Sequence, residues 1–503
     1  MPETSVTSGA DTASGCAIPE TVPLSAVESF TDEVDVLVVG FGIAGGCAAV
    51  QAASDGANVL VLERAAVAGG TTSMAGGHFY LGGGTPVQVA TGHEDSPEEM
   101  AKYLTAVSRD PEPDKIRAYC QDSVEHFGWL EALGFAFERS YYPEKAVIQP
   151  GTEGLMFTGN EKVWPFREQA VPAPRGHKVP VPGDTEGAAM VIDLLVKRCG
   201  DLGAEIRYET GAVALVVDDS PDGDGAVVGV RWKRFKETGY IRAGAVVLAA
   251  GGFVMNPDMV AAHTPQLAEK PFTLGSTYDD GLGIRMGRSV GGATKHMDQA
   301  FVTVAFYPPS SLLKGIIVNK RGERFVAEDS YHSRTSGFVL DQPDAAAYLI
   351  VDSEHIEHPK FPLTPFIDGW ESVAEMEAGL ELPEGSLQRT LERYNEHAAR
   401  GEDPDFHKHP DWLAPQDAGP WGAFDLSLGK AFYAGFTIGG LAVTVDGQVR
   451  REDDSLVPGL YAAGSCASNL AQDAQGYASG TQLGEGSYFG RRAGAAAAAR
   501  RTR

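Results

Sequence analysis

The segment from Asp35 to Glu63 constrains the fold of this chain more than any other. The apolar run DVLVV leads into the turn GFGIAGG, an Ala-rich stretch follows, and a second apolar run ends at Glu63. These lengths predict a strand, a helix and a second strand, which together form one βαβ unit. Gly40, Gly42 and Gly45 give the spacing GxGxxG directly at the strand-to-helix turn. We therefore expect an α/β fold with a Rossmann-like domain.

Each glycine of this turn meets a different steric requirement. The first permits a tight turn, the second lets the backbone approach a pyrophosphate, and the third lets the helix pack closely on the sheet. The amides and the dipole at the helix start then face the pyrophosphate. Glu63 lies near the spacing at which an acidic side chain binds the adenosine ribose. A lone GxGxxG could be a chance loop, but this context indicates a dinucleotide-binding site.

Further glycine-rich segments help to choose between NAD and FAD, which share this fingerprint. The run AGGTTSMAGG at residues 68–77 offers small side chains and free amides, against which a flavin ribityl chain and ring could lie. The runs AVVLAAGGF at 245–253 and VPGLYAAGS at 457–465 are apolar strands that lead into glycine turns. Together these segments favour FAD.

With these motifs, the sequence resembles the fumarate reductase and succinate dehydrogenase flavoprotein superfamily from Asp35 to Gly494. The resemblance implies bound FAD and adds the segment STYDDGLGIRMG, where Asp280 either contacts the cofactor or caps the following helix. Members with covalent flavin carry a histidine where Gly69 and Gly70 stand, so we expect noncovalent FAD. The expected cofactor residues are Gly40, Gly42, Ala44, Gly45, Glu63, Arg64, Gly70, Thr71, Thr72, Ser73, Gly76, Gly77, Ala250, Gly251, Asp280, Gly464, Thr481 and Leu483.

The residues that bind a dicarboxylate in fumarate reductases are replaced here. Those enzymes use His and Arg, because a bidentate guanidinium matches carboxylate geometry. Phe436 stands in place of the His, and TQLG from Thr481 stands in place of Asn-Arg-Leu-Gly. Tyr331 and His332 occupy the place of the proton-donating Arg, and Arg334 is displaced by about two residues. These replacements predict a largely apolar ligand with one polar handle.

The segments DSYHSR and DAQGYASGTQLGEG are similar to those of the 3-ketosteroid Δ4-(5α)-dehydrogenases, members of the same superfamily. Desaturation next to a ketone needs a proton acceptor, a donor to the enolate oxygen and a hydride acceptor, which is flavin N5. The resemblance implies that Tyr477 bonds the 3-keto oxygen, Ser479 accepts the 4β proton and Tyr331 relays it. Serine is a poor base by itself, so the Tyr331 and Ser479 side chains must touch.

Other interpretations of these residues and of the activity stay open. Either tyrosine could be a packing residue, and Ser479 could cap the last helix. The nearest rival activity is that of the 3-ketosteroid Δ1-dehydrogenases, whose pattern places the Tyr four residues after a Glu, whereas Tyr331 follows Glu328 by three. More distant rivals are a fumarate reductase-like enoate reductase and an inactive flavin-binding protein.

Composition and patterning predict the remaining properties of the chain. Its 503 residues suggest three parts: a flexible acidic leader at 1–33, an FAD-binding domain at 34–298 and 422–503, and an inserted α+β substrate-binding (catalytic) domain at 299–421. The net charge of −27 argues against nucleic acid as a partner. The five cysteines show neither metal-ligand nor CxxC spacing, and they fit a cytoplasmic protein without a metal site. No window is apolar enough for an integral membrane segment.

The sequence leaves the external electron acceptor open, and two long segments are only partly interpretable. Helical spacing runs from about 96 to 137. A Pro- and Gly-rich segment at 143–184 is expected to be a loop that covers another part of the molecule.

Overall fold

A nine-stranded sheet forms the centre of the computed structural model, which describes residues 14–500 except 184–186, 222–223, 269–270, 308, 360–361, 469 and 471–472. Its parallel part consists of β7 (Glu205–Arg207), β3 (Val59–Leu62), β2 (Asp32–Val39), β10 (Glu237–Leu248) and β21 (Leu456–Ala462). The antiparallel strands β9 (Val227–Arg234) and β8 (Gly211–Val217) continue it beyond β10, and β20 (Gln448–Arg450) pairs with β21.

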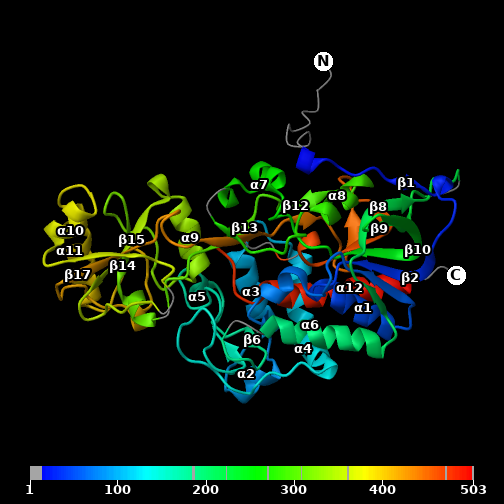
Figure 1. The fold of residues 1–503 in the computed structure, drawn as a ribbon. Helices are drawn as coiled ribbons and strands as arrows, with labels where there is room; N and C mark the ends of the chain where they lie inside the picture. The colour runs from blue at the N-terminus through cyan, green and yellow to red at the C-terminus, as the bar shows by residue number, and fades with distance from the viewer. Residues whose placement is uncertain are drawn as a thin grey trace.

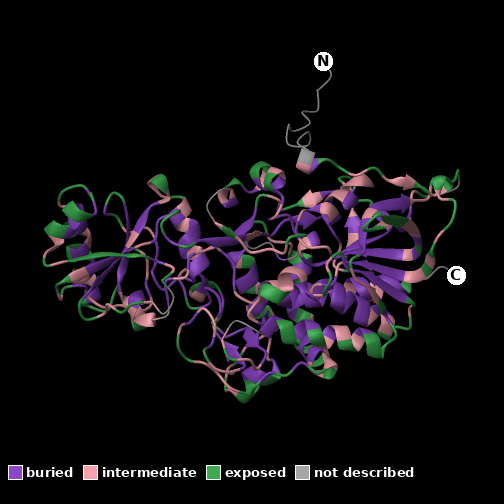
Figure 2. Ribbon diagram, in the orientation of Figure 1, coloured by how far each residue is buried: buried purple, intermediate pink, exposed green. Residues whose placement is uncertain are grey.

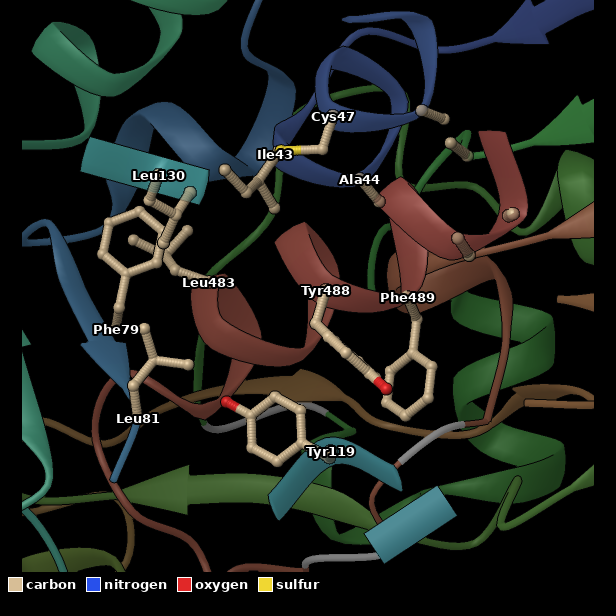
Figure 3. Packing of buried hydrophobic residues seen from close by; sticks show 14 of the residues in the cluster. Ile43, Ala44, Cys47, Phe79, Leu81, Tyr119, Leu130, Leu483, Tyr488 and Phe489 are labelled. Carbon is tan, nitrogen blue, oxygen red and sulfur yellow. The ribbon is translucent and has the colours of Figure 1, made fainter. Parts of the chain in front are cut away.

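Two helices from opposite ends of the chain cover one face of this sheet (Figure 1). They are α1 (Ile43–Ser54) and α12 (Thr481–Ala499). A Cβ atom at Gly490 would lie 2.4 Å from the Ala44 carbonyl oxygen, and one at Gly494 would lie 2.2 Å from that of Ala48. The two backbones therefore pack in direct contact, which larger residues would prevent. Figure 3 shows Ala44 close to α12, with Tyr488 and Phe489 on the same helix.

The other helices of this part surround the sheet and carry its connections. They are α2 (Pro86–Ala90), α3 (Pro97–Val107), α4 (Pro113–Leu133), α5 (Phe166–Gln169), α6 (Gly187–Asp201), α7 (Pro257–His263) and α8 (Leu282–Ser289). A small sheet of β4 (His78–Tyr80), β6 (Gly176–Lys178) and β5 (Leu155–Met156) lies near α2 (Figure 1). Figure 2 shows that the strands and the sheet-facing sides of these helices are buried.

A separate lobe has its own sheet and its own core (Figure 1). Its strands are β14 (Ile316–Asn319), β15 (Ala347–Asp352), β17 (Trp421–Asp425) and β16 (Phe366–Trp370), and its helices are α10 (Val373–Gly379) and α11 (Ser386–Ala398). Two short sheets pair strands from before the lobe with a strand from after it in the sequence. One contains β11 (Phe272–Thr273), β18 (Ala434–Thr437) and β13 (Ala300–Thr303), and the other contains β12 (Thr294–Lys295) and β19 (Gly440–Leu441). Helix α9 (His332–Leu340) lies between the lobe and the large sheet.

The α/β fold with its βαβ start agrees with the sequence prediction, while several boundaries differ. Strand β17 reaches Asp425, so the predicted domain boundary after residue 421 falls inside a strand that pairs with β15. The helical stretch at 96–137 is two helices, because Pro111 and Pro113 follow the end of α3 at Val107. The predicted loop at 143–184 contains β5, α5 and β6, and Asp184 itself lies outside the described residues.

The predicted flexible leader at 1–33 also needs correction. Residues 1–13 lie outside the described part of the chain, but the rest of the segment packs against the domain. The short strand β1 (Val22–Pro23) pairs with β8, Cys16 is buried, and Gly15 exchanges hydrogen bonds with Asp258 and Asn256. Pairing with an existing sheet satisfies backbone groups that the composition of the segment does not reveal.

Candidate active site

A cavity of about 500 Å³ lies where four parallel strands of the large sheet end. Gly40 follows β2, Glu63 follows β3, Ala250 lies just beyond β10, and Gly464 lies just beyond β21. All four residues line the cavity. Ligands of open α/β sheets bind outside the carboxyl ends of the strands. The fold therefore creates a binding site from segments that are far apart in the sequence.

The glycine turn between β2 and α1 has the geometry that its spacing predicts. Gly40 has φ of +96°, and a Cβ atom there would lie 2.5 Å from the Ala249 carbonyl oxygen. A Cβ atom at Gly45 would lie 2.0 Å from the Gly40 carbonyl oxygen, so only glycine lets α1 approach the turn. Gly42 lines the cavity directly before the first residue of α1, where helix amides face a bound anion.

Glu63 is buried at the edge of the cavity and accepts two backbone hydrogen bonds. Its carboxylate accepts from the amide of Phe41 at 2.8 Å and from that of Ala65 at 2.7 Å. Burial raises the pKa of Glu63, and these amides oppose the shift. The side chain is thus held at the end of β3, in the place expected for a ribose-binding carboxylate.

Two neighbouring aspartates of the segment before α8 line the cavity in different ways. Asp280 accepts from Arg64 at 2.7 Å and from the amide of Leu282, the first residue of α8, at 3.0 Å, while the N-cap position of α8 is Gly281. Asp279 is buried and accepts from the Thr71 hydroxyl. Burial raises the pKa of Asp279 to about 6, while the hydrogen bond from Thr71 opposes the shift. A Cβ atom at Gly251 would lie 1.9 Å from Asp279 Oδ1, so the carboxylate leaves room for no larger residue there.

One part of the cavity wall is aromatic. Phe436 and Tyr477 line it, and Phe301 packs against both rings at centroid distances of 4.7 and 4.5 Å. Among the described residues that line the cavity, Arg64 is the one cation, and it is paired with Asp280. Arg334 lies elsewhere, with its guanidinium 4.8 Å from the ring centre of Phe166 and 5.0 Å from that of Phe338.

Tyr331 and Ser479 are not part of the cavity lining, but they meet next to its aromatic residues. The Tyr331 hydroxyl lies 2.5 Å from Ser479 Oγ, and Tyr331 belongs to the same buried cluster as Tyr477 and Phe301. Ser479 does not cap α12, because the N-cap position is Gly480 and the Ser479 hydroxyl bonds Tyr331 instead. Burial raises the pKa of Tyr331, and the bond with Ser479 opposes that shift. The phenol therefore stays protonated at neutral pH.

The hydroxyl of Tyr477 is placed to donate a hydrogen bond. Burial raises its pKa well above the ordinary value of 10.0, and the neighbouring Tyr331 and Glu485 act in the same direction. A hydrogen bond with the backbone amide of Gln482, in the first turn of α12, opposes the shift. Because the oxygen accepts from that amide, its own proton is available to a ligand in the cavity.

The ring of His332 packs against that of Tyr331 at a centroid distance of 4.0 Å. Its Nδ1 bonds the hydroxyl of Thr303. Burial lowers the pKa of His332 to about 3, so the imidazole is neutral and supplies no positive charge to a carboxylate substrate.

Most of the predicted cofactor residues line the cavity, but four do not. Gly45 and Thr481 lie behind the lining, the first against Gly40 and the second with its hydroxyl bonded to the Ala478 carbonyl oxygen. Gly76 and Gly77 pack against Gly187 at the start of α6. Sequence reasoning missed other residues that line the cavity, among them Ser276, Tyr278, Asp279, Ser465 and Gln482. The one local signal that could have found them is their position beside a predicted glycine turn or polar segment.

Comparison with known proteins identifies the cofactor of this site. Residues 35–484 match the family described as FAD binding domain. The chain belongs to this family. FAD is thus its cofactor, and the fold is that of the flavoproteins related to fumarate reductase and the steroid dehydrogenases.

Three relatives are informative about the class of enzyme. The solved structure of 3-ketosteroid-Δ4-(5α)-dehydrogenase from Rhodococcus jostii RHA1, in complex with 4-androstene-3,17-dione, is 40% identical; the match has a TM-score of 0.90 and covers 96% of this chain and 100% of that one. Urocanate reductase of Eggerthella lenta is 30% identical, over 94% of this chain and 76% of the relative. The 3-oxo-5-alpha-steroid 4-dehydrogenase of Comamonas testosteroni is 27% identical, over 86% and 93%.

The residues around the cavity fit FAD. The glycine turn and the start of α1 suit the pyrophosphate, Glu63 suits the adenosine ribose, and the small residues after β3 leave space along the cavity wall. Gly69 and Gly70 precede Thr71, and both have positive φ. Among the described residues, no group of three or more His, Cys, Asp or Glu side chains is arranged to hold a metal ion. In the same part of the chain, no helix is both long and apolar enough to cross a bilayer.

Proposed function

We propose that the chain is an FAD-dependent 3-ketosteroid Δ4-(5α)-dehydrogenase, which forms a double bond between carbons 4 and 5 of its substrate. The observation that carries this proposal is the contact of 2.5 Å between Tyr331 and Ser479, beside Tyr477 in a cluster of apolar side chains. A ketosteroid offers one ketone oxygen on an apolar ring system, which fits a site whose aromatic part carries hydroxyl groups and whose one described cation, Arg64, is paired with Asp280.

Tyr477 is the donor to the 3-keto oxygen. When carbon 4 loses a proton, negative charge develops on that oxygen, and a hydrogen bond aimed at it lowers the barrier. The raised pKa of Tyr477 keeps its proton on the phenol, and the amide of Gln482 fixes the phenol oxygen. Tyr477 therefore binds the ketone and stabilises the enolate with the same hydrogen bond.

Ser479 and Tyr331 together remove the 4β proton. Ser479 Oγ takes the proton from carbon 4 while its own proton passes to Tyr331, whose phenol proton moves on toward solvent. Neither hydroxyl is basic enough to do this alone. FAD, when bound, supplies the acceptor for the hydride that leaves carbon 5, and we propose that it is held without a covalent bond.

The substrate and setting follow from the same features. We propose a small apolar ketosteroid as ligand, in steroid (lipid) metabolism, with an external electron acceptor that reoxidises the flavin. We also propose a cytoplasmic location, which is supported by Cys47, Cys120, Cys199 and Cys466, since all four are buried and none forms a disulfide.

An anaerobic titration tests the proposal. A 5α-saturated 3-ketosteroid should bleach the flavin absorbance of the purified protein, whereas succinate, the product of the fumarate reductases, should not. Bleaching by succinate alone would favour the enoate reductase alternative. A steroid product with its double bond between carbons 1 and 2 would favour the Δ1-dehydrogenase alternative, and a flavin that no substrate reduces would indicate an inactive binding protein.

A further inference from the structure

A three-residue segment outside the cavity binds the backbones of both proposed proton-transfer residues. Thr158, Gly159 and Asn160, which we call the 158–160 bracket, lie in the segment between β5 and α5. The Tyr331 amide donates to Asn160 Oδ1 at 2.9 Å. The Ser479 amide donates to the Thr158 carbonyl oxygen, also at 2.9 Å. With the contact between the Tyr331 and Ser479 hydroxyls, these bonds close a ring that contains both residues and the bracket.

The bracket is itself held rigidly. The Asn160 amide donates to the Tyr103 hydroxyl at 2.8 Å, and the Gly159 amide donates to Glu161 at 3.0 Å. A Cβ atom at Gly159 would lie 2.7 Å from the Tyr103 hydroxyl and 2.8 Å from the Cβ of Ala478. The segment thus packs directly on Ala478, the residue that precedes Ser479. Contacts with Tyr103 and with Ala478 together determine its position.

The hydrogen bond of Asn160 is fully buried. The exposed fraction of Asn160 is 0%, and the neighbouring Thr158 is 2% exposed. A buried amide that loses its acceptor costs free energy, because it is removed from water without a replacement partner. Tyr331 is the residue that precedes α9, so its amide has no other acceptor within that helix. Asn160 is therefore what fixes the backbone at Tyr331 relative to Ser479.

We propose that Asn160 is a positioning residue that sets the distance between the Tyr331 and Ser479 hydroxyls and thereby the rate of proton removal. This inference rests on the proposed function, because it concerns the proton relay of that reaction. Asn160, like Tyr331 and Ser479, is not part of the cavity lining, and its Oδ1 bonds the Tyr331 backbone amide, so its effect on the reaction passes through Tyr331. Proton transfer depends steeply on donor–acceptor distance, and a misplacement of about 1 Å can cost a factor of about 10².

The test compares Asn160→Leu, which is similar in size but lacks the acceptor, with Asn160→Asp, which keeps an acceptor oxygen in either protonation state. Gln416→Leu is the matched control, because Gln416 is 1% exposed and accepts from the Asp352 amide at 3.0 Å in the distant lobe. Each holoenzyme is assayed with a 5α-saturated 3-ketosteroid, plain and deuterated at carbon 4. A crystal structure of each Asn160 variant gives the distance between the Tyr331 hydroxyl and Ser479 Oγ.

Asn160→Leu should lower kcat about 10- to 100-fold with KM within a factor of about two, and should raise the isotope effect at carbon 4. Asn160→Asp should recover turnover to within a few-fold of the wild type, and Gln416→Leu should leave kcat and the isotope effect unchanged. Wild-type kcat in Asn160→Leu, or equal loss in Asn160→Leu and Asn160→Asp, would overturn the inference. If the wild type turns over no ketosteroid, the proposed function fails. The positioning role is then tested by the distance between the two hydroxyl oxygens in Asn160→Leu: a distance above about 3.5 Å supports it, and a shorter distance contradicts it.

Discussion

The hydroxyl oxygens of Tyr331 and Ser479 lie 2.5 Å apart, although 148 residues separate them in the chain. Tyr331 directly precedes α9, at the junction with the separate lobe. Ser479 lies two residues before α12, which packs on α1. The pair therefore exists only when the two parts of the molecule are assembled. A proton can pass directly between two hydroxyls at this distance.

Removal of either hydroxyl should abolish the relay, so the two losses should not add. Tyr331→Phe and Ser479→Ala should each lower the rate of flavin reduction by a ketosteroid about 10²- to 10⁴-fold. The double variant should be only slightly slower than the worse single variant. Stopped-flow measurement of flavin bleaching gives the three rates. Fully multiplicative losses would show that the two residues act independently and would remove the relay from the mechanism.

Loss of the Tyr477 hydroxyl should affect the step in which charge develops on the ketone oxygen. Tyr477→Phe keeps the ring packed against Phe301 and Phe436, so the substrate should still bind, but turnover should fall by about 10²-fold or more. Tyr433→Phe is the control, because Tyr433 is a buried tyrosine that donates to the Leu426 carbonyl oxygen away from the cavity. Equal rates for Tyr477→Phe and the control would exclude Tyr477 as the donor.

A side chain at the glycine turn should exclude FAD without unfolding the protein. Gly42 lines the cavity, and a Cβ atom there would already lie 3.1 Å from Thr72 Oγ1. Gly42→Val should therefore purify with little flavin, measured as the ratio of visible to protein absorbance. Gly128→Val in α4 is the control, because a Cβ atom there meets no other atom within 4 Å. Wild-type flavin content in Gly42→Val would contradict the cofactor site.

Flavin from the wild type should be released on denaturation, as expected for noncovalent binding.

The buried carboxyl of Asp279 should make stability depend on pH. Its pKa of about 6 in the folded protein exceeds the ordinary 3.8, because burial favours the protonated form. Between these two pH values the folded state holds the proton more tightly than the unfolded state does, so the contribution of Asp279 to stability is lost as pH rises from about 4 to about 6.

Asp279→Asn removes this dependence. The free energy of unfolding of the variant minus that of the wild type should therefore increase from pH 4 to about 6 and then level off. Denaturant unfolding of both proteins with saturating FAD measures the difference. A difference that stays constant with pH, or that decreases over this window, would show that the Asp279 pKa is not raised.

The local part of the cofactor site was predictable from the sequence, because its signals lie close together. Gly40, Gly42, Gly45 and Glu63 belong to one βαβ unit, and their steric roles follow from spacing alone. Asp279 was not predicted, because its importance comes from Thr71 and Gly251, which only the folded chain brings beside it. The adjacent Asp280 was predicted, and its carboxylate pairs with Arg64 and accepts from the amide of Leu282.

The tertiary part of the site was predictable only through resemblance to a family. No pattern in the sequence places Tyr331 beside Ser479, and the roles of Tyr331, Tyr477 and Ser479 remain predictions. The contribution of Asn160 was invisible, because 171 residues separate it from Tyr331 and it lies in a segment that looked like a loop. Pairing of β1 with β8 was likewise hidden, since it depends on a sheet edge formed far along the chain.

Analysis of the product from a stereospecifically labelled substrate tests the central claim most directly. The substrate is a 5α-saturated 3-ketosteroid with deuterium on the β face of carbon 4, and the product is examined by mass spectrometry and nuclear magnetic resonance. If Ser479 and Tyr331 remove the 4β proton, the product carries a double bond between carbons 4 and 5 and has lost the deuterium. Retention of the deuterium, or a double bond between carbons 1 and 2, would contradict the account.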